Sequence, residues 1–302
     1  MRTRLGVNTG FATNRYPEPE VWGRIVGEEL GLRTVMFVAD LLGMFYPQEI
    51  IASEIAKVKS MAERYHFSID SAFTAAFTRV NHVAHPNSKI REVWVQYLMR
   101  LARTAAALGA RTMGAHFGIL SFRDYEELPR REGMTEIAIE NWRRIARVGK
   151  EVGLEFLIFE PMSVPREFAC TIDSTHELLD RVNSNIAIPM KLCLDVDHGY
   201  AGSGDPREID PYVWLREFAK VSPIVHIKQS SADKSGHWPF TPEKNKQGII
   251  RPEKVLDALE KGGAEDVTLL LECSWRERYP ADTQVVSDLK QSVAYWRPYV
   301  KD

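Results

Sequence analysis

Short apolar runs alternate along the chain with longer segments that carry apolar residues at helical spacing. The runs have the length of buried strands, and they are LGVN (5–8), TVMFV (34–38), FSID (67–70), TMGAHFG (112–118), LEFLIFE (154–160), MKLCLDVD (190–197), PIVHIK (223–228) and VTLLLE (267–272). Helical spacing is clearest in EIIASEIAKVKSMAERY, IREVWVQYLMRLARTAAALGA, EIAIENWRRIARVGKEVG and PEKVLDALEKGG. The pattern predicts that strand and helix alternate eight times.

Eight alternations in 302 residues predict an α/β fold, a single TIM (β/α)8 barrel, with a doubly wound open sheet as the alternative. No Pro/Gly/Ser-rich linker or change of composition divides the chain, so residues 1–302 are expected to form one domain. The irregular stretch SSADKSGHWPFTPEKNKQG (230–248) follows the seventh strand and is longer than an ordinary loop. It predicts a functional loop over the mouth of the barrel.

The composition excludes several classes of protein. Hydrophobic residues make up 44% and charged residues 26% of the chain, and 39 Lys and Arg face 41 Asp and Glu. This near-neutral balance gives no general basic surface for nucleic acid. The chain shows no apolar run of membrane-spanning length, no signal-peptide pattern and no CxxC spacing among its 3 cysteines. We therefore expect a cytoplasmic enzyme without nucleic-acid or membrane partners, whose exposed barrel helices could form a homodimer.

Four successive strands, from the fifth to the eighth, end near a side chain that can bind a metal ion. These side chains are Glu160 in IFEPMS, Asp195 in CLDVDHG, His226 in IVHIKQ and Glu272 in LLECSW. The C-terminal ends of barrel strands converge on one face, where active sites lie. Taken singly, each could be a surface carboxylate or a hydrogen-bonded core histidine. Their occurrence on four neighbouring strands predicts a divalent metal site.

The ligand types indicate which metal would bind. Three carboxylates and one imidazole form an oxygen-rich, hard set, which suits Mn²⁺, Mg²⁺ or Co²⁺ better than a structural zinc ion. His198 follows Asp195 by three residues. We expect it at the edge of the same site, where it would hydrogen-bond a substrate oxygen.

This arrangement resembles the xylose-isomerase-like sugar-phosphate isomerases and epimerases, in particular the D-tagatose 3-epimerase type. Their pattern is a Glu that ends strand five, a D-x-x-H after strand six, a His that ends strand seven and a Glu that ends strand eight. Here it falls on Glu160, on Asp195 with His198, on His226 and on Glu272. The resemblance implies metal-dependent epimerisation or isomerisation of a ketose, in which both glutamates bind the metal and move protons.

A narrower similarity links three segments to the tetrulose-phosphate 3-epimerases, also called D-erythrulose-1-phosphate 3-epimerases. The segments are GVNTGFATNRYPEPEVWGRIVGEELGL (6–32), NHVAHPNSKIREVW (81–94) and FEPMSVPRE (159–167). This similarity implies a phosphorylated ketose as the substrate. The family's histidine in the early barrel has two candidates here, His85 and His116, and His116 could equally be a core histidine.

Epimerisation at the carbon beside a ketone requires a base that removes a proton and an acid that returns one to the opposite face. Glu160 and Glu272 come from strands three steps apart around the barrel, so we expect them to approach the substrate from opposite sides. A metal ion would stabilise the enediolate as a Lewis acid. An aldose-ketose isomerase, in which the proton returns to the neighbouring carbon, is the main alternative.

Two further alternatives are weaker. An endonuclease-type metal hydrolase would need more histidine ligands than this chain offers, with 8 His in all, and a basic groove. A non-catalytic barrel that binds a sugar would show metal or sugar binding without turnover.

Several other side chains near the predicted mouth are candidates for substrate contact. Besides His198 and His116, they are Arg166, Lys228, Lys234, His237, Trp238 and Arg276. Lys228 shares a strand face with His226, because side chains alternate with period two, and it either contacts substrate or forms a buried pair with a carboxylate. The cations and the long loop predict a phosphate site after strands seven and eight. The same loop could instead be a lid over an uncharged sugar.

Overall fold

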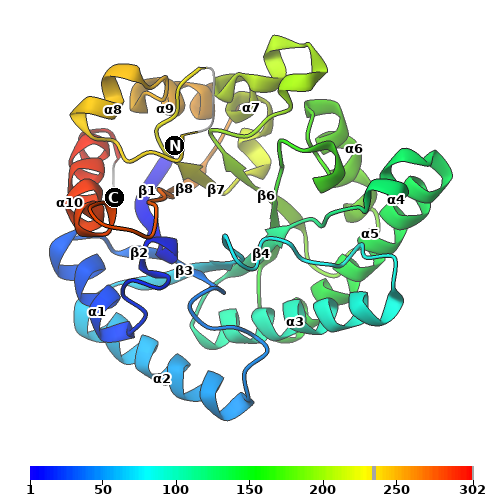
Figure 1. Cartoon of the computed structure of the whole chain (residues 1–302), viewed down its shortest axis with the longest axis horizontal. Helices are drawn as coiled ribbons and strands as arrows, with labels where there is room; N and C mark the ends of the chain where they lie inside the picture. The colour runs from blue at the N-terminus through cyan, green and yellow to red at the C-terminus, as the bar shows by residue number, and fades with distance from the viewer. Residues whose placement is uncertain (233–235, 301–302) are drawn as a thin grey trace.

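The chain forms a closed barrel of parallel strands in which each strand pairs with the next and β8 pairs with β1 (Figure 1). This computed structural model describes residues 1–232 and 236–300. The strands within these residues are β1 (Arg2–Asn8), β2 (Thr34–Val38), β3 (Ser68–Phe73), β4 (Thr112–His116), β5 (Phe156–Glu160), β6 (Met190–Asp195), β7 (Ile224–Ile227) and β8 (Asp266–Leu271). The predicted TIM barrel is confirmed, and the open-sheet alternative is wrong.

Helices surround the barrel on its outside (Figure 1). They are α1 (Pro19–Arg24), α2 (Gln48–Tyr65), α3 (Ser88–Ala107), α4 (Phe122–Glu126), α5 (Leu128–Glu151), α6 (Ile172–Asn183), α7 (Pro211–Phe218), α8 (Pro242–Gln247), α9 (Pro252–Lys261) and α10 (Ala281–Trp296). The short helices α4 and α8 are additional to the alternation of one strand and one helix that the sequence predicts. Across the described part of the chain, no helix combines the length and apolar character needed to cross a membrane.

Several predicted boundaries differ from the observed ones. β1 begins at Arg2, because its ladder with β8 starts at the pairing of Arg2 with Asp266. Strands β7 and β8 end just before Lys228 and Glu272, so these two side chains follow the last residue of each strand. α5 begins at Leu128, eight residues before its apolar spacing becomes evident, since a proline is tolerated in the first helical turn. α8 lies within the segment that was expected to be irregular.

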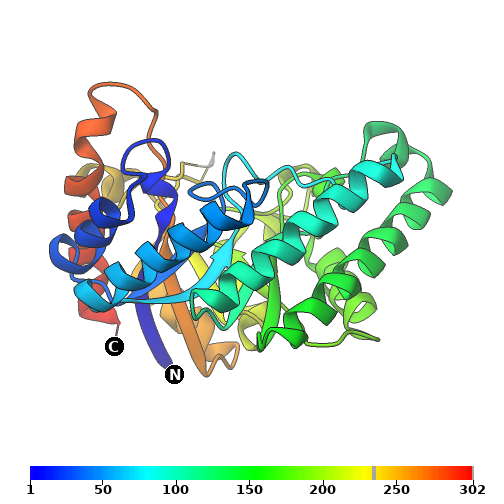
Figure 2. The ribbon, with the colours of Figure 1, turned by 90° about the horizontal axis from the view of Figure 1, so that it is seen from below.

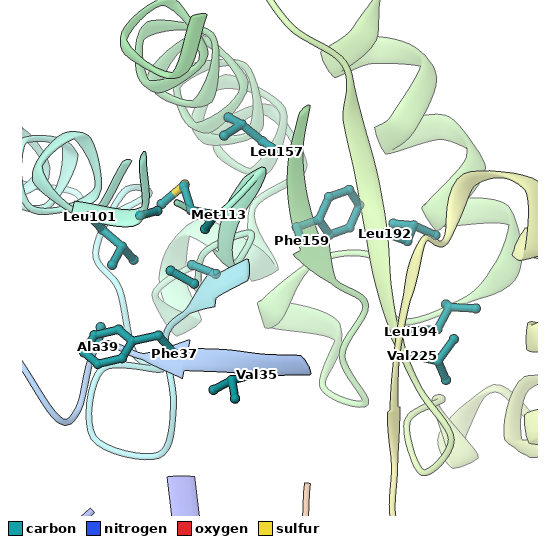
Figure 3. Close-up of a cluster of buried hydrophobic side chains, with 14 of the residues drawn as sticks. Val35, Phe37, Ala39, Leu101, Met113, Leu157, Phe159, Leu192, Leu194 and Val225 are labelled. Atoms are coloured by element: carbon teal, nitrogen blue, oxygen red, sulfur yellow. The ribbon is translucent and has the colours of Figure 1, made fainter. Parts of the chain in front are cut away.

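The alternation of side chains along the strands separates two apolar layers. One set points outward and packs against the helices, and Figure 3 shows part of it, including Val35, Phe37, Leu157, Phe159, Leu192 and Leu194. The other set fills the interior of the barrel and consists of Met36, Phe73, Phe156, Ile158, Cys193, Ile224 and Leu270. A side chain that points inward nearer the C-terminal end of a strand therefore lies above this apolar interior.

The loops that follow the strands bind one another around the mouth of the barrel. Figure 2 shows the N-terminus at the other end, where β1 begins. The end of β2 contacts the segment after β1 through Val38 N and Thr9 Oγ1 (3.0 Å). Contacts between loops include Thr78 N to Asp40 Oδ1 (3.0 Å), Arg166 Nη1 to Leu120 O (2.7 Å), Gly199 N to Ser163 Oγ (3.2 Å), Gly236 N to Asp197 Oδ2 (3.2 Å), Ser274 N to His237 O (2.9 Å) and Arg15 Nη2 to Trp275 O (2.8 Å). These bonds fix the walls of the region into which the strand ends point.

The close approach of β4 and β5 requires glycine at position 114. A Cβ atom at Gly114 would lie 2.1 Å from the backbone oxygen of Ile158, its partner in the ladder. We expect Gly114→Ala to lower the free energy of unfolding by about 1–3 kcal/mol, the usual effect of overpacking. The control is Gly133→Ala in α5, where a Cβ meets nothing within 4 Å. It should raise stability by up to about 1 kcal/mol, and equal urea midpoints for the two variants would contradict the packing argument.

Candidate active site and metal centre

The four predicted metal ligands converge at the C-terminal end of the barrel. Each continues the inward-facing register of its strand: Glu160 follows Ile158 by two residues, Asp195 follows Cys193, His226 follows Ile224 and Glu272 follows Leu270. One ligand atom from each lies within 4.8 Å of all the others, and Glu160, Asp195 and His226 are buried. Residues from four strands thus form one compact cluster.

His226 turns one ring nitrogen toward the carboxylates and the other toward the barrel interior. Its Nδ1 lies 3.1 Å from Glu160 Oε1 and 3.4 Å from Glu272 Oε2. Its Nε2 lies 3.2 Å from the sulfur of Met36 and 3.4 Å from that of Cys193. Nδ1 is therefore the nitrogen available to a metal ion shared with the carboxylates.

Lys228 contacts this cluster as a buried cation. Its Nζ donates to Asp195 Oδ2 and, at 3.1 Å, to Glu272 Oε2, and its side chain has no exposed surface. Burial alone would lower the pKa of Lys228, but the charges of Asp195 and Glu272 raise it above its ordinary value. Of the two roles considered for Lys228, the structure shows the buried pair with carboxylates.

The histidines next to the cluster favour its ionised form. His116 Nε2 lies 3.0 Å from Glu160 Oε2, and His198 Nδ1 lies 3.7 Å from Glu160 Oε1. Burial alone would raise the pKa of Glu160, but the interactions with His198 and His226 hold it well below its usual range. Burial would likewise raise the pKa of Asp195, and His198 and Lys228 lower it instead. Both carboxylates are therefore anionic at neutral pH.

The donor set and its charge fit a divalent metal ion. Three carboxylates and the Lys228 ammonium leave two formal negative charges when His226 is neutral. Burial alone would lower the pKa of His226, yet its interactions with Cys193, Glu272 and Glu160 raise it well above its ordinary value. A cluster with this demand for positive charge is unfavourable in a buried site unless a cation balances it.

A cavity of about 420 Å³ opens above the cluster. Five of the predicted site residues line it, namely His116, Glu160, His198, His237 and Glu272. The volume lies within the range of small-molecule sites. The predicted acid/base and substrate-contact side chains therefore share one cavity with the ligand cluster.

His237 is a neutral imidazole on the wall of this cavity. Burial lowers the pKa of His237 to about 3, and the charge of Lys228 adds to the effect. Its backbone has a φ of 44°, and its carbonyl oxygen accepts the N–H of Ser274 at 2.9 Å. A neutral ring can donate one hydrogen bond and accept another.

Of the two candidates for the early-barrel histidine, His116 lies at the site. It lines the cavity and contacts Glu160, whereas His85 accepts the N–H of Asn87 at 3.0 Å and does not belong to the described cavity wall. Trp238 forms a β-bridge with Gln229 and, like His85, lies outside that wall.

Two of the predicted cations, Arg166 and Arg276, lie apart from the described cavity wall. Arg166 donates to Leu120 O at 2.7 Å, and Arg276 is exposed to solvent. Neither is among the described residues that line the cavity. Lys234 falls outside the described residues.

Several residues of the site do not follow from the sequence argument. The cavity is also lined by Asn8, Arg15, Asp40, Thr74 and Arg79. Asn8 Nδ2 donates to Glu272 Oε1 at 3.1 Å. Its place at the end of the first apolar run was a usable signal, the same one that pointed to the four candidate metal ligands. Arg15, Asp40 and Arg79 lie in loops, where no such periodicity exists.

Comparison with known proteins identifies the family. A family model described as a xylose isomerase-like TIM barrel matches residues 26–298. D-erythrulose 1-phosphate 3-epimerase from Brucella abortus (strain 2308) is 36% identical over 301 residues, which cover 99% of this chain and 97% of that protein. Both agree with the resemblance seen in the sequence motifs.

Solved structures share the fold over nearly their whole length. A Rhodospirillum rubrum protein provisionally described as a xylose isomerase is 25% identical, with a TM-score of 0.89 and coverage of 99% of this chain and 100% of that one. D-psicose 3-epimerase with D-tagatose, from Clostridium cellulolyticum H10, is 14% identical, with a TM-score of 0.72 and coverage of 99% and 100%. The barrel is closed, the family model matches most of the chain, and the Brucella relative aligns over nearly its whole length. This chain therefore belongs to the xylose isomerase-like TIM barrel family.

Proposed function

We propose that this protein is an isomerase, a metal-dependent 3-epimerase that acts on a short ketose phosphate. The observation that carries the proposal is the placement of Glu160 and Glu272, which both belong to the ligand cluster and both line the same cavity. The relative from Brucella abortus, named as a D-erythrulose 1-phosphate 3-epimerase, supports the reaction and the phosphorylated substrate.

Glu160 and Glu272 are the groups that would move protons. Glu160 is held by His116 and is anionic at neutral pH, the ionisation state that a general base requires. Glu272 is oriented by Asn8 through one oxygen and by Lys228 through the other. The two glutamates come from β5 and β8, so one would remove the proton at the carbon beside the carbonyl and the other would return one to the opposite face.

Glu160, Asp195, His226 and Glu272 would hold the metal ion, for which the hard donor set favours Mn²⁺, Mg²⁺ or Co²⁺. When bound, a divalent metal supplies Lewis-acid stabilisation for the negative charge that develops on the substrate's oxygens. His198 and the neutral His237 would orient the substrate by hydrogen bonds. Trp275 provides apolar surface on the wall beside them.

An aldose-ketose isomerase would use the same groups, and the two reactions differ in the carbon that receives the proton. Incubation of the metal-loaded protein with free and phosphorylated ketoses in deuterated water separates them by NMR. We expect a ketose phosphate of about four carbons to exchange deuterium at C3 and to yield its C3 epimer. Aldose formation would favour the alternative, and a complete absence of exchange would reject both.

The metal centre is tested by removal of single ligands. Asp195→Ala and His226→Ala should each weaken divalent-metal binding by at least about 100-fold, since loss of a residue that merely supports a ligand already reduces affinity by about 10- to 100-fold. Calorimetry with Mn²⁺ and elemental analysis measure the effect. His85→Ala is the matched control, because this histidine lies outside the described cavity wall and should keep full binding. Unchanged metal content in the Asp195 and His226 variants would place the metal elsewhere.

The proton-transfer role is tested by Glu160→Gln and Glu272→Gln. Each substitution keeps an oxygen that can bind metal but removes the basic carboxylate, so turnover should fall on the order of a hundredfold or more while some metal is retained. Deuterium exchange at C3 and metal content are measured on the same samples. A variant that turns over near the normal rate would exclude its glutamate from proton transfer.

A further inference from the structure

The described cavity wall contains two cationic side chains, Arg15 and Arg79. Arg15 is already engaged as a structural bond between loops: its Nε donates to Asp282 Oδ1 and its Nη2 donates to Trp275 O at 2.8 Å. Only 9% of its side chain is exposed. Its guanidinium therefore has little capacity for a further anion.

Arg79 is more exposed than Arg15 and makes fewer hydrogen bonds. It lies in the loop between β3 and α3, and 40% of its side chain is exposed. Among the described residues its side chain makes one polar contact, from Nη2 to Glu167 Oε1. Its Nε is buried without a hydrogen-bond partner, so the terminal nitrogens are the groups that can reach a ligand. Nη1 makes no hydrogen bond to any described residue, so this end of the guanidinium is free to bind one.

The loop that carries Arg79 is held in place on both sides. Asp40, after β2, accepts the N–H of Phe77 at 2.8 Å and the N–H of Thr78 at 3.0 Å. Thr78 Oγ1 also donates to Asp40 and accepts the N–H of Ala75 at 3.1 Å, which closes the turn. Because both oxygens of Asp40 are used by the loop, this carboxylate orients the turn next to Arg79.

Glu167 fixes the other side of the guanidinium. It lies in η3 (Pro165–Glu167), after β5, and is buried, with 8% of its side chain exposed. If Arg79 moved away, a buried carboxylate would lose its cation, which is strongly unfavourable. Arg79 is thus a pre-positioned donor that remains paired with Glu167 while it binds a second anion.

We infer that Arg79 binds the phosphate of the substrate and thereby sets the preference for a phosphorylated ketose. This inference rests on the proposed function and names the residue that recognises its substrate class. The ion pair of Arg79 and Glu167 is neutral overall, so recognition comes from directed N–H donors of the planar guanidinium rather than from a general positive field. The phosphate site would then lie at the loop after β3, and not only at the loops after strands seven and eight.

The test compares D-erythrulose 1-phosphate with free D-erythrulose. Arg79→Gln should lower kcat/KM for the phosphate ester by about 10- to 100-fold, mainly through KM, as expected for loss of hydrogen bonds to a charged group. Turnover of the free sugar should change little. Arg79→Lys should restore only a small part of the loss, since an ammonium lacks the planar fork of donors.

Two controls protect the test against a folding defect. Arg79→Gln combined with Glu167→Gln leaves no unpaired buried charge and should show the same loss of phosphate preference as the single Arg79 variant. Arg276→Ala removes an exposed arginine outside the described cavity wall and should leave both substrates unaffected. Inorganic phosphate, used as a competitive inhibitor of free-sugar turnover, should bind correspondingly more weakly to the single Arg79→Gln variant and to the double variant.

The outcomes distinguish this inference from the proposed function. Suppose that the unmodified protein epimerises the phosphate ester, and that the Arg79 variants lose activity equally on both sugars or keep full activity on both. Arg79 then does not recognise the phosphate, and the epimerase assignment stands. If the unmodified protein acts on neither sugar, the proposed function is wrong and this inference is rejected with it.

Discussion

The structure depends on how three carboxylates are kept charged at the end of an apolar barrel. Glu160, Asp195 and Glu272 lie directly above an interior filled by side chains such as Ile158 and Leu270. In that position an ionised carboxylate is stable only with partners that compensate its lost hydration. Lys228 and the surrounding histidines provide part of this compensation, and a divalent cation would provide the remainder. The same buried negative charge is therefore what would attract a metal ion to the cluster.

Two groups of strands supply the ligand cluster and much of the remaining cavity wall. The ligand cluster comes from β5 to β8, whose inward register brings one ligand from each strand to the same level. Much of the remaining cavity wall comes from the first part of the chain, with Asn8 at the end of β1, Asp40 after β2 and Arg79 after β3. The ligand cluster and the rest of the cavity wall can therefore vary separately, which is how one fold can support many functions.

Contacts between loops connect these two groups. Arg79 and Glu167 join the loop after β3 to the loop after β5, and Asp40 joins the loops after β2 and β3. Bonds of this kind hold these parts of the wall in a defined position, which lowers the entropy cost of binding a ligand there. Hydrogen bonds also hold the loop that contains Arg166. The guanidinium and the carbonyl oxygen of Arg166 both bond to Leu120, after β4.

The sequence by itself determined the barrel and its ligand cluster. Strand residues alternate with period two, and parallel strands place their C-terminal ends on one face, so Glu160, Asp195, His226 and Glu272 could be recognised from their positions at the ends of apolar runs. Only the tertiary structure decided which cations face the cavity. Arg166 and Arg276 lie near strand ends in sequence, yet Arg166 bonds to a neighbouring loop and Arg276 is exposed to solvent. Arg79 reaches the cavity because its partner Glu167, 88 residues away, and the turn held by Asp40 place it there. Loop side chains follow no repeating geometry, so contacts between distant segments, rather than local periodicity, set their direction.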